Sequence, residues 1–294
     1  MRSWGCSNSK GALMALVSNT PTPWSTTSRS RLRNRKLCPR KPPDIRIKAR
    51  PIMKTKSFAL GLASACWVAT AGAADSPAPK ENVFATKPLG IQVSIKMDGP
   101  YMEAADLQII CLFKHKASGD TYQGAAKETD AHLGGILSAL RNRGEFVGES
   151  GETILFTPPE GSIPAKQFMI IGLGEEKDLS IETLRVVGRI AAREAVRLKA
   201  KHVAWAPVIR DEGNLAIDVG EGDRAFAEQL LSSYDTEKRL QAQGLAPAFT
   251  IESVVIEAGP TFFDGAVKQV GQGIESITAE LQKRDSTPYA STSK

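Results

Sequence analysis

Short apolar segments alternate with longer amphipathic segments between about residues 90 and 283, and this alternation is the strongest constraint on the fold. The apolar segments are rich in β-branched residues and bounded by Gly, Pro or Asp, which is typical of strands. We expect strands at residues 91–97, 107–113, 153–156, 168–171, 202–208 and 251–256. The amphipathic segments predict helices at about residues 122–142, 181–199, 224–241 and 262–283. Strands that alternate with helices of this length predict a mostly parallel sheet with helices on both faces.

The helix expected at residues 181–199 has the clearest period. Its apolar residues recur every three or four positions, as on a helix that buries one stripe: Ile181, Leu184, Val187, Ala191, Ala195 and Leu198. Four arginines follow one another at intervals of four: Arg185, Arg189, Arg193 and Arg197. They form either a ridge that binds an anion or a partner, or a solvated face relieved by Glu182 and Glu194. For a ridge, we expect protein or lipopolysaccharide-like anions as ligands before DNA.

Residues 53–73 have the layout of a secretory signal peptide. Lys54 and Lys56 precede an apolar stretch from Phe58 to about Ala69, and an Ala-x-Ala cleavage site ends at Ala73. This stretch is shorter than the roughly 20 residues of a permanent membrane helix. We therefore expect a periplasmic or secreted protein, cleaved near Ala73, without a permanent membrane span. A lipoprotein anchored at Cys66 is the alternative, but the apolar run continues past that residue.

Residues 1–52 precede this signal and contain 12 Lys or Arg, one acidic residue (Asp44) and many Ser, Thr and Pro. A segment of this composition cannot bury a core, so we expect a disordered basic leader. It is either an upstream region that cells do not translate or an organelle transit peptide. The signal directly behind it favours the untranslated region.

The charge of the sequence is concentrated in this leader. Residues 1–73 carry 14 basic and one acidic residue, which leaves 24 basic and 31 acidic residues for 74–294, a formal net charge of −7. Nucleic acid binders need a cationic footprint, so we expect no nucleic acid partner after export. Cys111 is the one cysteine after residue 73, which excludes an internal disulfide in that part. We expect a buried apolar thiol there rather than a reactive one.

The stretch from Gly134 to Pro207 carries a family resemblance. It contains "LSALRNRGEF", a "GESGET" turn, "MIIGLGEEKDLSIETLR", an Ala- and Arg-rich helix and the strand "HVAWAP". In this order the segments resemble the N-terminal domain of the M17 leucyl aminopeptidases. "AEQLLSSYDTEKR" continues the resemblance, and "VGQGIESITAELQKRDSTP" resembles the linker helix that leads to the catalytic domain of that family.

This resemblance implies a three-layer α/β/α sandwich of macro-domain type, with a mostly parallel mixed sheet. We place the domain at residues 89–258, a flexible tether at 74–88 before it, and a linker-type helix and tail at 259–294 after it.

The resemblance does not extend to the chemistry of the family. The M17 catalytic domain holds two divalent metals through motifs such as "NTDAEGR", and the sequence contains none of these motifs. A two-metal hydrolase needs such a carboxylate cluster. The sequence also lacks a Gly-x-Ser-x-Gly elbow, HExxH, a CxxC pair and a P-loop. We therefore expect no catalytic residue, no metal and no cofactor.

Two weaker site candidates remain. Gly172 and Gly174 follow an expected strand and could present backbone amides to a phosphate. However, the acidic residues directly after them would repel a phosphate, and Ser180 gives the loop a structural purpose as a helix cap. Glu128 and His132 lie one helical turn apart and could share a metal, but two ligands without a third indicate a surface pair.

We predict an exported non-catalytic module that binds a protein partner or self-associates. In the M17 family the linker helix packs against the catalytic domain, so we expect the apolar face of the last helix to be exposed and available to a partner: Phe262, Phe263, Val267, Val270 and Ile274. One alternative is the regulatory or structural half of a split metal-dependent aminopeptidase. Another is a macro-like sensor of a small ligand such as a nucleotide.

Overall fold

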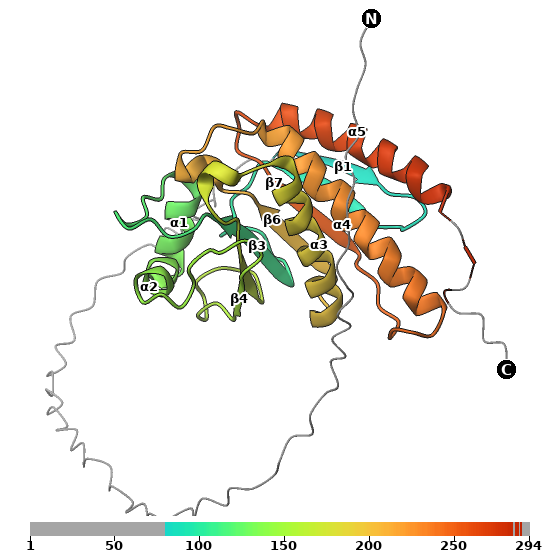
Figure 1. The fold of residues 1–294 in the computed structure, drawn as a ribbon, viewed down its shortest axis with the longest axis horizontal. Helices are drawn as coiled ribbons and strands as arrows, with labels where there is room; N and C mark the ends of the chain where they lie inside the picture. Colours follow the sequence, from blue (N-terminus) through green and yellow to red (C-terminus); the bar gives the residue numbers. More distant parts are fainter. Residues whose placement is uncertain (1–79, 285, 288, 290–294) are drawn as a thin grey trace, which may run out of the picture. The chain divides into compact units, whose positions relative to one another are not determined.

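A computed structural model describes residues 80–284, 286–287 and 289, so the expected leader and signal peptide lie outside the described residues. The described residues form one seven-stranded sheet in the order β1-β2-β7-β6-β3-β5-β4 (Figure 1). The strands are β1 Glu81–Ala85, β2 Gln92–Lys96, β3 Leu107–Leu112, β4 Thr153–Phe156, β5 Phe168–Gly172, β6 His202–Ala206 and β7 Ser253–Glu257. β2, β7, β6, β3 and β5 are parallel, and β1 and β4 pair antiparallel at the two edges. The prediction of a mostly parallel mixed sheet is confirmed.

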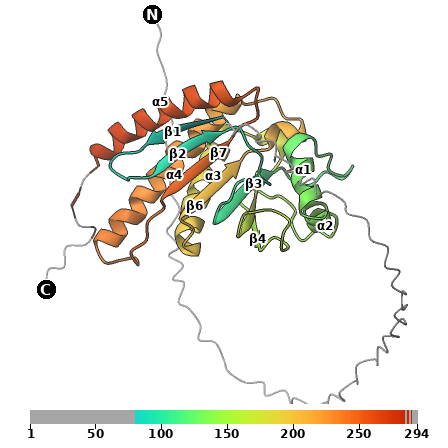
Figure 2. The ribbon, with the colours of Figure 1, turned by 180° about the vertical axis from the view of Figure 1, so that it is seen from behind.

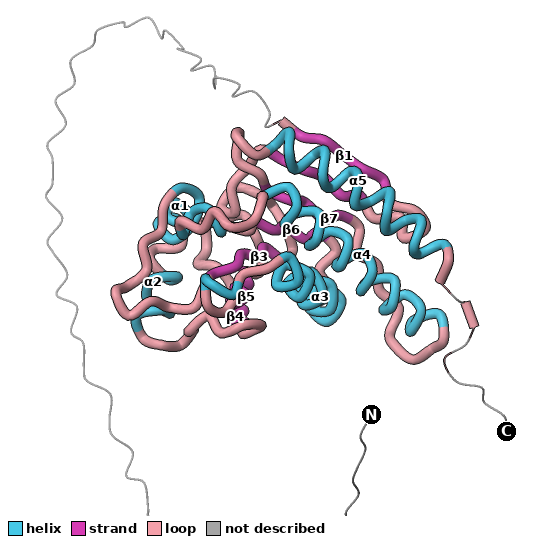
Figure 3. The backbone as a smooth tube through the Cα atoms, turned by 45° about the horizontal axis from the view of Figure 1, so that its top comes forward, coloured by secondary structure: helices cyan, strands magenta, loops and turns pink. Residues whose placement is uncertain are grey.

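Helices cover both faces of this sheet. On one face lie α3 Ile181–Leu198, α4 Val219–Ala242 and α5 Phe263–Gln282, with α4 between α3 and α5 (Figures 1 and 3). On the other face lie α1 Gly124–His132 and α2 Ile136–Asn142, near β3 (Figure 2). The 3-10 turns η1 Glu176–Asp178 and η2 Ile209–Glu212 follow β5 and β6. The architecture is therefore the expected three-layer α/β/α sandwich.

The core consists of two apolar clusters, one on each face of the sheet. Successive residues of β3 point to opposite faces. Thus Ile109 and Cys111 belong to the cluster under α3–α5, whereas Ile110 and Leu112 belong to the cluster under α1 and α2. Cys111 is fully buried, and its Sγ accepts a hydrogen bond from Trp205 Nε1 at 3.4 Å. Because burial raises the pKa of this thiol to about 12, Cys111 is the buried, unreactive thiol that we expected.

Helix α3 begins and packs as its sequence predicts. The Ser180 hydroxyl accepts a hydrogen bond from the Thr183 backbone N–H, and the Thr183 hydroxyl accepts one from the Ser180 N–H. This reciprocal capping satisfies two amides that have no partner within the helix. Leu184, Val187 and Ala191 of the predicted stripe are buried against the sheet and α4.

The helix expected at residues 122–142 is two helices. Gly134 and Gly135 adopt φ angles of 69° and 83°, the left-handed region that glycine enters without a Cβ penalty, and α1 ends here. The Asp130 carboxylate then accepts hydrogen bonds from the Leu137 and Ser138 N–H groups at 2.9 and 3.2 Å, which fixes the start of α2. The prediction of one continuous helix was wrong because this glycine pair ends the first helix.

The prediction of a flexible tether at residues 74–88 is wrong for residues 81–85, because they form β1. This strand pairs with the free edge of β2, and Phe84 packs into the main apolar cluster beside Gly271 of α5. Helix α4 also begins earlier than expected, because the Asp218 carboxylate caps it by accepting a hydrogen bond from the Glu221 N–H at 3.0 Å. Within the described residues, we find no helix with both the length and the hydropathy that a membrane crossing requires.

Candidate ligand-binding cleft

A cleft of about 550 Å³ lies at the carboxyl ends of β2, β6 and β7. Residues 97–102 after β2, residues 206–211 at the end of β6 and residues 257–260 at the end of β7 form its walls. The first turns of α1 and α4 complete it. Ligands of open α/β sheets bind at this edge, and the volume is within the usual range for pockets that hold small molecules.

Asp223 of α4 lines this cleft and is fully buried, yet neither carboxylate oxygen has a hydrogen-bond partner within the described residues. One turn further along the helix, Phe226 stacks on Trp205 of β6 with ring centroids 3.8 Å apart. Asp223 therefore lies on the sheet-facing side of α4, where the sheet ends and the cleft begins. Burial, reinforced by the Asp218 carboxylate, raises the pKa of Asp223 well above its ordinary value and favours its protonated form.

Glu257, the last residue of β7, also lines the cleft and is 4% exposed. Its Oε2 accepts a hydrogen bond from Gln108 Nε2 at 2.7 Å, but Glu257 Oε1 and Gln108 Oε1 lack partners within the described residues. Burial raises the pKa of Glu257 to about 8; the Gln108 hydrogen bond and Lys96 oppose this rise, and Asp98 and Glu103 add to it. A protonated Glu257 carries the donor that the Gln108 carbonyl lacks. We refer to Asp223 and Glu257 together as the cleft carboxyls.

The remaining charged residues of the cleft are already engaged. Among the described residues that line it, Arg210 is the one cation, and its guanidinium donates to the carbonyl oxygens of Asn214 and Ile217 at 2.7 and 2.5 Å. The Asp211 carboxylate accepts a hydrogen bond from the Ala126 N–H at 2.9 Å and so holds the start of α1. Glu128 accepts a hydrogen bond from the Tyr101 hydroxyl.

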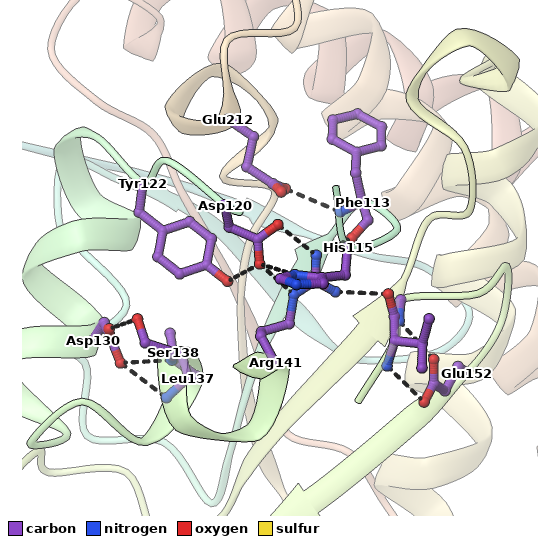
Figure 4. Close-up of polar contacts among 12 residues, drawn as sticks. Phe113, His115, Asp120, Tyr122, Asp130, Leu137, Ser138, Arg141, Glu152 and Glu212 are labelled. Carbon is purple, nitrogen blue, oxygen red and sulfur yellow. Dashed lines mark hydrogen bonds and ion pairs between the residues drawn. The ribbon is translucent and has the colours of Figure 1, made fainter. Parts of the chain in front are cut away.

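Next to the cleft, a buried polar cluster supports the loop between β3 and α1 (Figure 4). The Arg141 side chain, 1% exposed, donates to Asp120 from Nε at 2.7 Å and to the carbonyl oxygens of Phe113 and Val147 at 2.7 and 2.9 Å. His115 and the Tyr122 hydroxyl also contact Asp120, at 2.9 and 3.3 Å. Although burial alone would raise the pKa of Asp120, the hydrogen bonds from Arg141 and His115 lower it overall.

Glu212 joins the same cluster from η2. Its Oε1 accepts a hydrogen bond from the Phe113 N–H at 3.0 Å, directly after β3 ends (Figure 4). Burial raises the pKa of Glu212 to about 7 despite this hydrogen bond. The consecutive residues Asp211 and Glu212 thus attach two elements, α1 and β3, to one short turn. The cluster therefore has a structural role, fixing the loops that border the cleft.

The arginine ridge of α3 is on the surface and largely paired with acidic residues: Arg185 with Glu182 and Glu228, Arg189 with Glu182, and Arg197 with Glu194. Arg193 is exposed and makes no ion pair with the described residues. These pairs favour the interpretation as a solvated face relieved by acidic residues, and the ridge lies outside the cleft lining.

The loop of Gly172 and Gly174 does not present free amides. The Gly172 N–H donates to the Glu152 carbonyl at 2.8 Å, and the Gly174 N–H donates to the Gly148 carbonyl at 2.9 Å. A Cβ at residue 172 would lie 2.1 Å from the Glu149 carbonyl oxygen, so the glycine permits two backbone segments to approach closely. The structure does not favour this weaker candidate for a phosphate site, because the amides of both glycines already donate to the neighbouring turn.

The apolar face of α5 is not exposed. Phe263 is 2% exposed, Val270 0% and Ile274 6%, and Phe262 and Val267 are partly buried. This face packs against β1, β2 and α4 of the same domain. The expectation of an exposed partner surface on the last helix was wrong, because the helix completes the core of its own sheet.

Glu128 and His132 are engaged with a neighbouring aromatic ring. The Tyr101 ring stacks on His132 with centroids 4.6 Å apart, and its hydroxyl contacts Glu128. Across the part of the chain that the structure describes, no group of three or more His, Cys, Asp or Glu is arranged to hold a metal ion.

The cleft carboxyls were missed by the sequence analysis, although the sequence held a signal for each. Asp223 occurs one turn before Phe226 and Ala227, on what becomes the buried stripe of a helix. Glu257 directly follows the apolar run of β7 at the carboxyl end of a parallel strand. An acidic residue in either position is a site candidate, because burial of an unpaired carboxyl is costly.

Comparison with known proteins finds a family model that matches less than half of the chain. Residues 109–240 match the family model of the cytosol aminopeptidase N-terminal domain. A probable cytosol aminopeptidase of Alkaliphilus oremlandii is 30% identical over 174 residues, which cover 57% of this chain and 35% of that protein. The corresponding protein of Thermosynechococcus vestitus is 38% identical over 112 residues, or 38% of this chain and 21% of that protein. The chain thus spans about a third or less of the length of these relatives.

Solved structures are more distant. A mutant tomato leucine aminopeptidase is 19% identical with a TM-score of 0.48, covering 69% of this chain and 38% of that one. An Oceanobacillus iheyensis macrodomain with ADP is 14% identical with a TM-score of 0.45, covering 67% of this chain and 98% of that one. Residues 109–240 are thus similar to the N-terminal domain of the cytosol aminopeptidase (M17) family.

Proposed function

We propose that the described domain is a non-catalytic module that binds a small organic ligand in the cleft at the carboxyl ends of β2, β6 and β7. The observation that carries this proposal is a cleft of about 550 Å³ lined by two buried carboxyls, each with at least one oxygen that lacks a partner within the described residues. Buried polar groups are normally hydrogen-bonded, and an unpaired one costs roughly 1–3 kcal/mol. A ligand that supplies the missing contacts would recover part of that cost.

Small-ligand binding replaces the partner surface on α5 as the basis of our functional proposal. The face that we had expected to dock a protein is buried in the domain, whereas the cleft is open to solvent. The longer relatives are named as probable cytosol aminopeptidases. The matched residues, 109–240, correspond to the N-terminal domain of that family, so we propose a binding role for this domain.

We also propose that this module works outside the cytoplasm. This proposal rests on the sequence of residues 53–73, with its two lysines, apolar stretch and Ala-x-Ala site. The ligand of an exported module would be a small molecule that is present in the periplasm or outside the cell.

A fragment screen by protein-observed NMR tests the binding role. We expect organic fragments to shift the amide signals of cleft residues such as Gly222 and Gly259 in the purified protein. Ala125→Trp places an indole on a half-buried cleft residue of α1 and should abolish these shifts. Ala131→Trp, at an exposed position of the same helix outside the cleft lining, is the matched control and should leave them intact. Fragments that shift no cleft signal, or that bind equally well in both variants, would refute the proposal.

A further inference from the structure

We propose that the ligand is an organic ammonium ion whose charged group pairs with one of the cleft carboxyls, foremost Asp223, and whose apolar body lies along the cleft walls. This inference rests on the proposed function, since it names the chemical class of the molecule that the cleft takes.

The charge of the cleft favours a cation. Six carboxyl groups line it, and even with Asp223 and Glu257 protonated the acidic residues outnumber the single cation: Asp98, Glu128, Asp211, Asp218, Asp223 and Glu257. The one guanidinium among the described lining residues, that of Arg210, is held by two backbone carbonyls. A concave surface lined by charges of one sign concentrates ions of the opposite sign. Phosphates and carboxylates would be repelled from this cleft.

The unmet hydrogen bonds select a donor. Four of the six carboxyls have a partner: Asp98 lies 3.5 Å from Lys96 Nζ, and Glu128, Asp211 and Asp218 accept hydrogen bonds from neighbouring groups. The cleft carboxyls are different, because both oxygens of Asp223 and Oε1 of Glu257 accept no hydrogen bond from any of the described residues. An ammonium group has three donors and no acceptor, which complements these oxygens. Charge-assisted hydrogen bonds of this kind are the strongest that proteins form.

Apolar side chains supply the rest of the recognition. Met97, Tyr101, Leu184, Ile217 and Phe262 line the walls and would contact a hydrocarbon body. A small hydrated inorganic cation would leave these walls uncovered, whereas an ammonium ion with an aliphatic or aromatic chain would bury them.

Binding of such a ligand is linked to proton release. Burial raises the pKa of both cleft carboxyls. The Asp218 carboxylate raises the pKa of Asp223 further. At Glu257, Asp98 and Glu103 raise the pKa further, whereas the Gln108 hydrogen bond and Lys96 lower it. The free protein therefore holds a proton that a carboxyl must release when it pairs with a cation. The balance is a protonated carboxyl plus an ammonium ion giving a carboxylate–ammonium pair plus one proton in solution. Affinity should then rise with pH up to the pKa of the ligand.

Three probes of one shape test the inference by titration calorimetry on the purified full chain: 4-phenylbutylammonium, 4-phenylbutanol and 4-phenylbutanoate. We expect the ammonium to bind at least tenfold more tightly than the alcohol, and the carboxylate to bind most weakly. Measurements in two buffers of different ionisation enthalpy should show proton release with the ammonium and none with the alcohol.

Asp223→Asn keeps the shape of the side chain and removes its ability to ionise. We expect this variant to bind the ammonium at least tenfold more weakly and to show no proton release from residue 223. Its affinity for the alcohol should stay within about twofold of the wild-type value, which also shows that the variant folds. Glu221→Gln changes an exposed acid of the same helix outside the cleft lining and should alter none of these values.

The outcomes separate the two proposals. If the alcohol or the carboxylate binds in the cleft as tightly as the ammonium, the ammonium inference is wrong while the cleft remains a binding site. Loss of affinity for all three probes in Asp223→Asn, with a folded protein, would also overturn the inference, because the loss would not depend on charge. If no probe and no fragment binds the cleft, the proposed function itself is wrong.

Discussion

Replacement of Glu257 by Gln should stabilise this protein, and the gain should depend on pH. Glu257 is buried at the end of β7, and burial raises its pKa from the ordinary 4.5 to about 8. The folded state therefore binds a proton that the unfolded state releases above about pH 4.5. It follows that the free energy of unfolding of the wild-type protein falls between about pH 4.5 and pH 8, and that Glu257 contributes no change outside this window.

The magnitude follows from the interval between 4.5 and the working pH. At about 1.4 kcal/mol for each pH unit, the cost of keeping Glu257 protonated at pH 7 is roughly 3 kcal/mol, as an upper limit. A Gln at this position stays neutral, so Glu257→Gln avoids the cost. Its amide group can also donate to Gln108 Oε1, which lacks a partner within the described residues of the wild type.

Urea unfolding followed by tryptophan fluorescence between pH 4.5 and pH 8 measures this effect. We expect the variant and the wild type to differ little at pH 4.5 and by up to roughly 3 kcal/mol at pH 7. Glu160→Gln, at an exposed loop position, is the control and should show no such divergence. Parallel curves for Glu257→Gln and wild type across this range would refute the reasoning that Glu257 is buried and protonated.

Three other predictions follow from the structure. Arg141→Ala should lower the free energy of unfolding by about 3–5 kcal/mol because it leaves Asp120 buried without its cation. The control Arg189→Ala, at an exposed ion pair, should lower it by less than about 1 kcal/mol. Equal losses for the two variants in urea unfolding would contradict this prediction. Gly172→Ala should destabilise the protein by about 1–3 kcal/mol because its Cβ would meet a carbonyl oxygen at 2.1 Å, and an unchanged Tm would show that the neighbouring turn yields freely. The intact mass of the exported protein should correspond to a chain that begins at Ala74; a mass that includes residues 1–52, or a lipid on Cys66, would exclude the proposed processing.

The fold was largely predictable because its signals are local. The apolar runs of β3 and β5, the stripe of α3 and the cap at Ser180 all act within one element, and each appears in the structure. The errors arose where a distant partner decides the local structure. Residues 81–85 become a strand because the edge of β2 is free to pair, which no pattern within those residues reveals.

The candidate site was less predictable, for the same physical reason. The cleft forms where the ends of β2, β6 and β7 meet, and the order of these strands in the sheet differs from their order in the sequence. Gln108 and Glu257, which form a buried hydrogen bond, lie 149 residues apart. The arginines of α3 stood out in the sequence as a possible ridge because their spacing is regular, but regular spacing on a helix describes a surface and not a cavity.

The attachment of two elements to η2 has a practical consequence for the loop at residues 114–123. Glu212 holds the backbone just before this loop, at Phe113, and Asp211 holds the backbone just after it, at Ala126. Between these fixed ends, residues 116–118 are exposed. Extra residues inserted there would extend into solvent while both anchors stay in place. This loop is therefore a suitable position for a genetically inserted reporter near the cleft, since both of its ends are fixed while residues 117 and 118 of its tip are exposed.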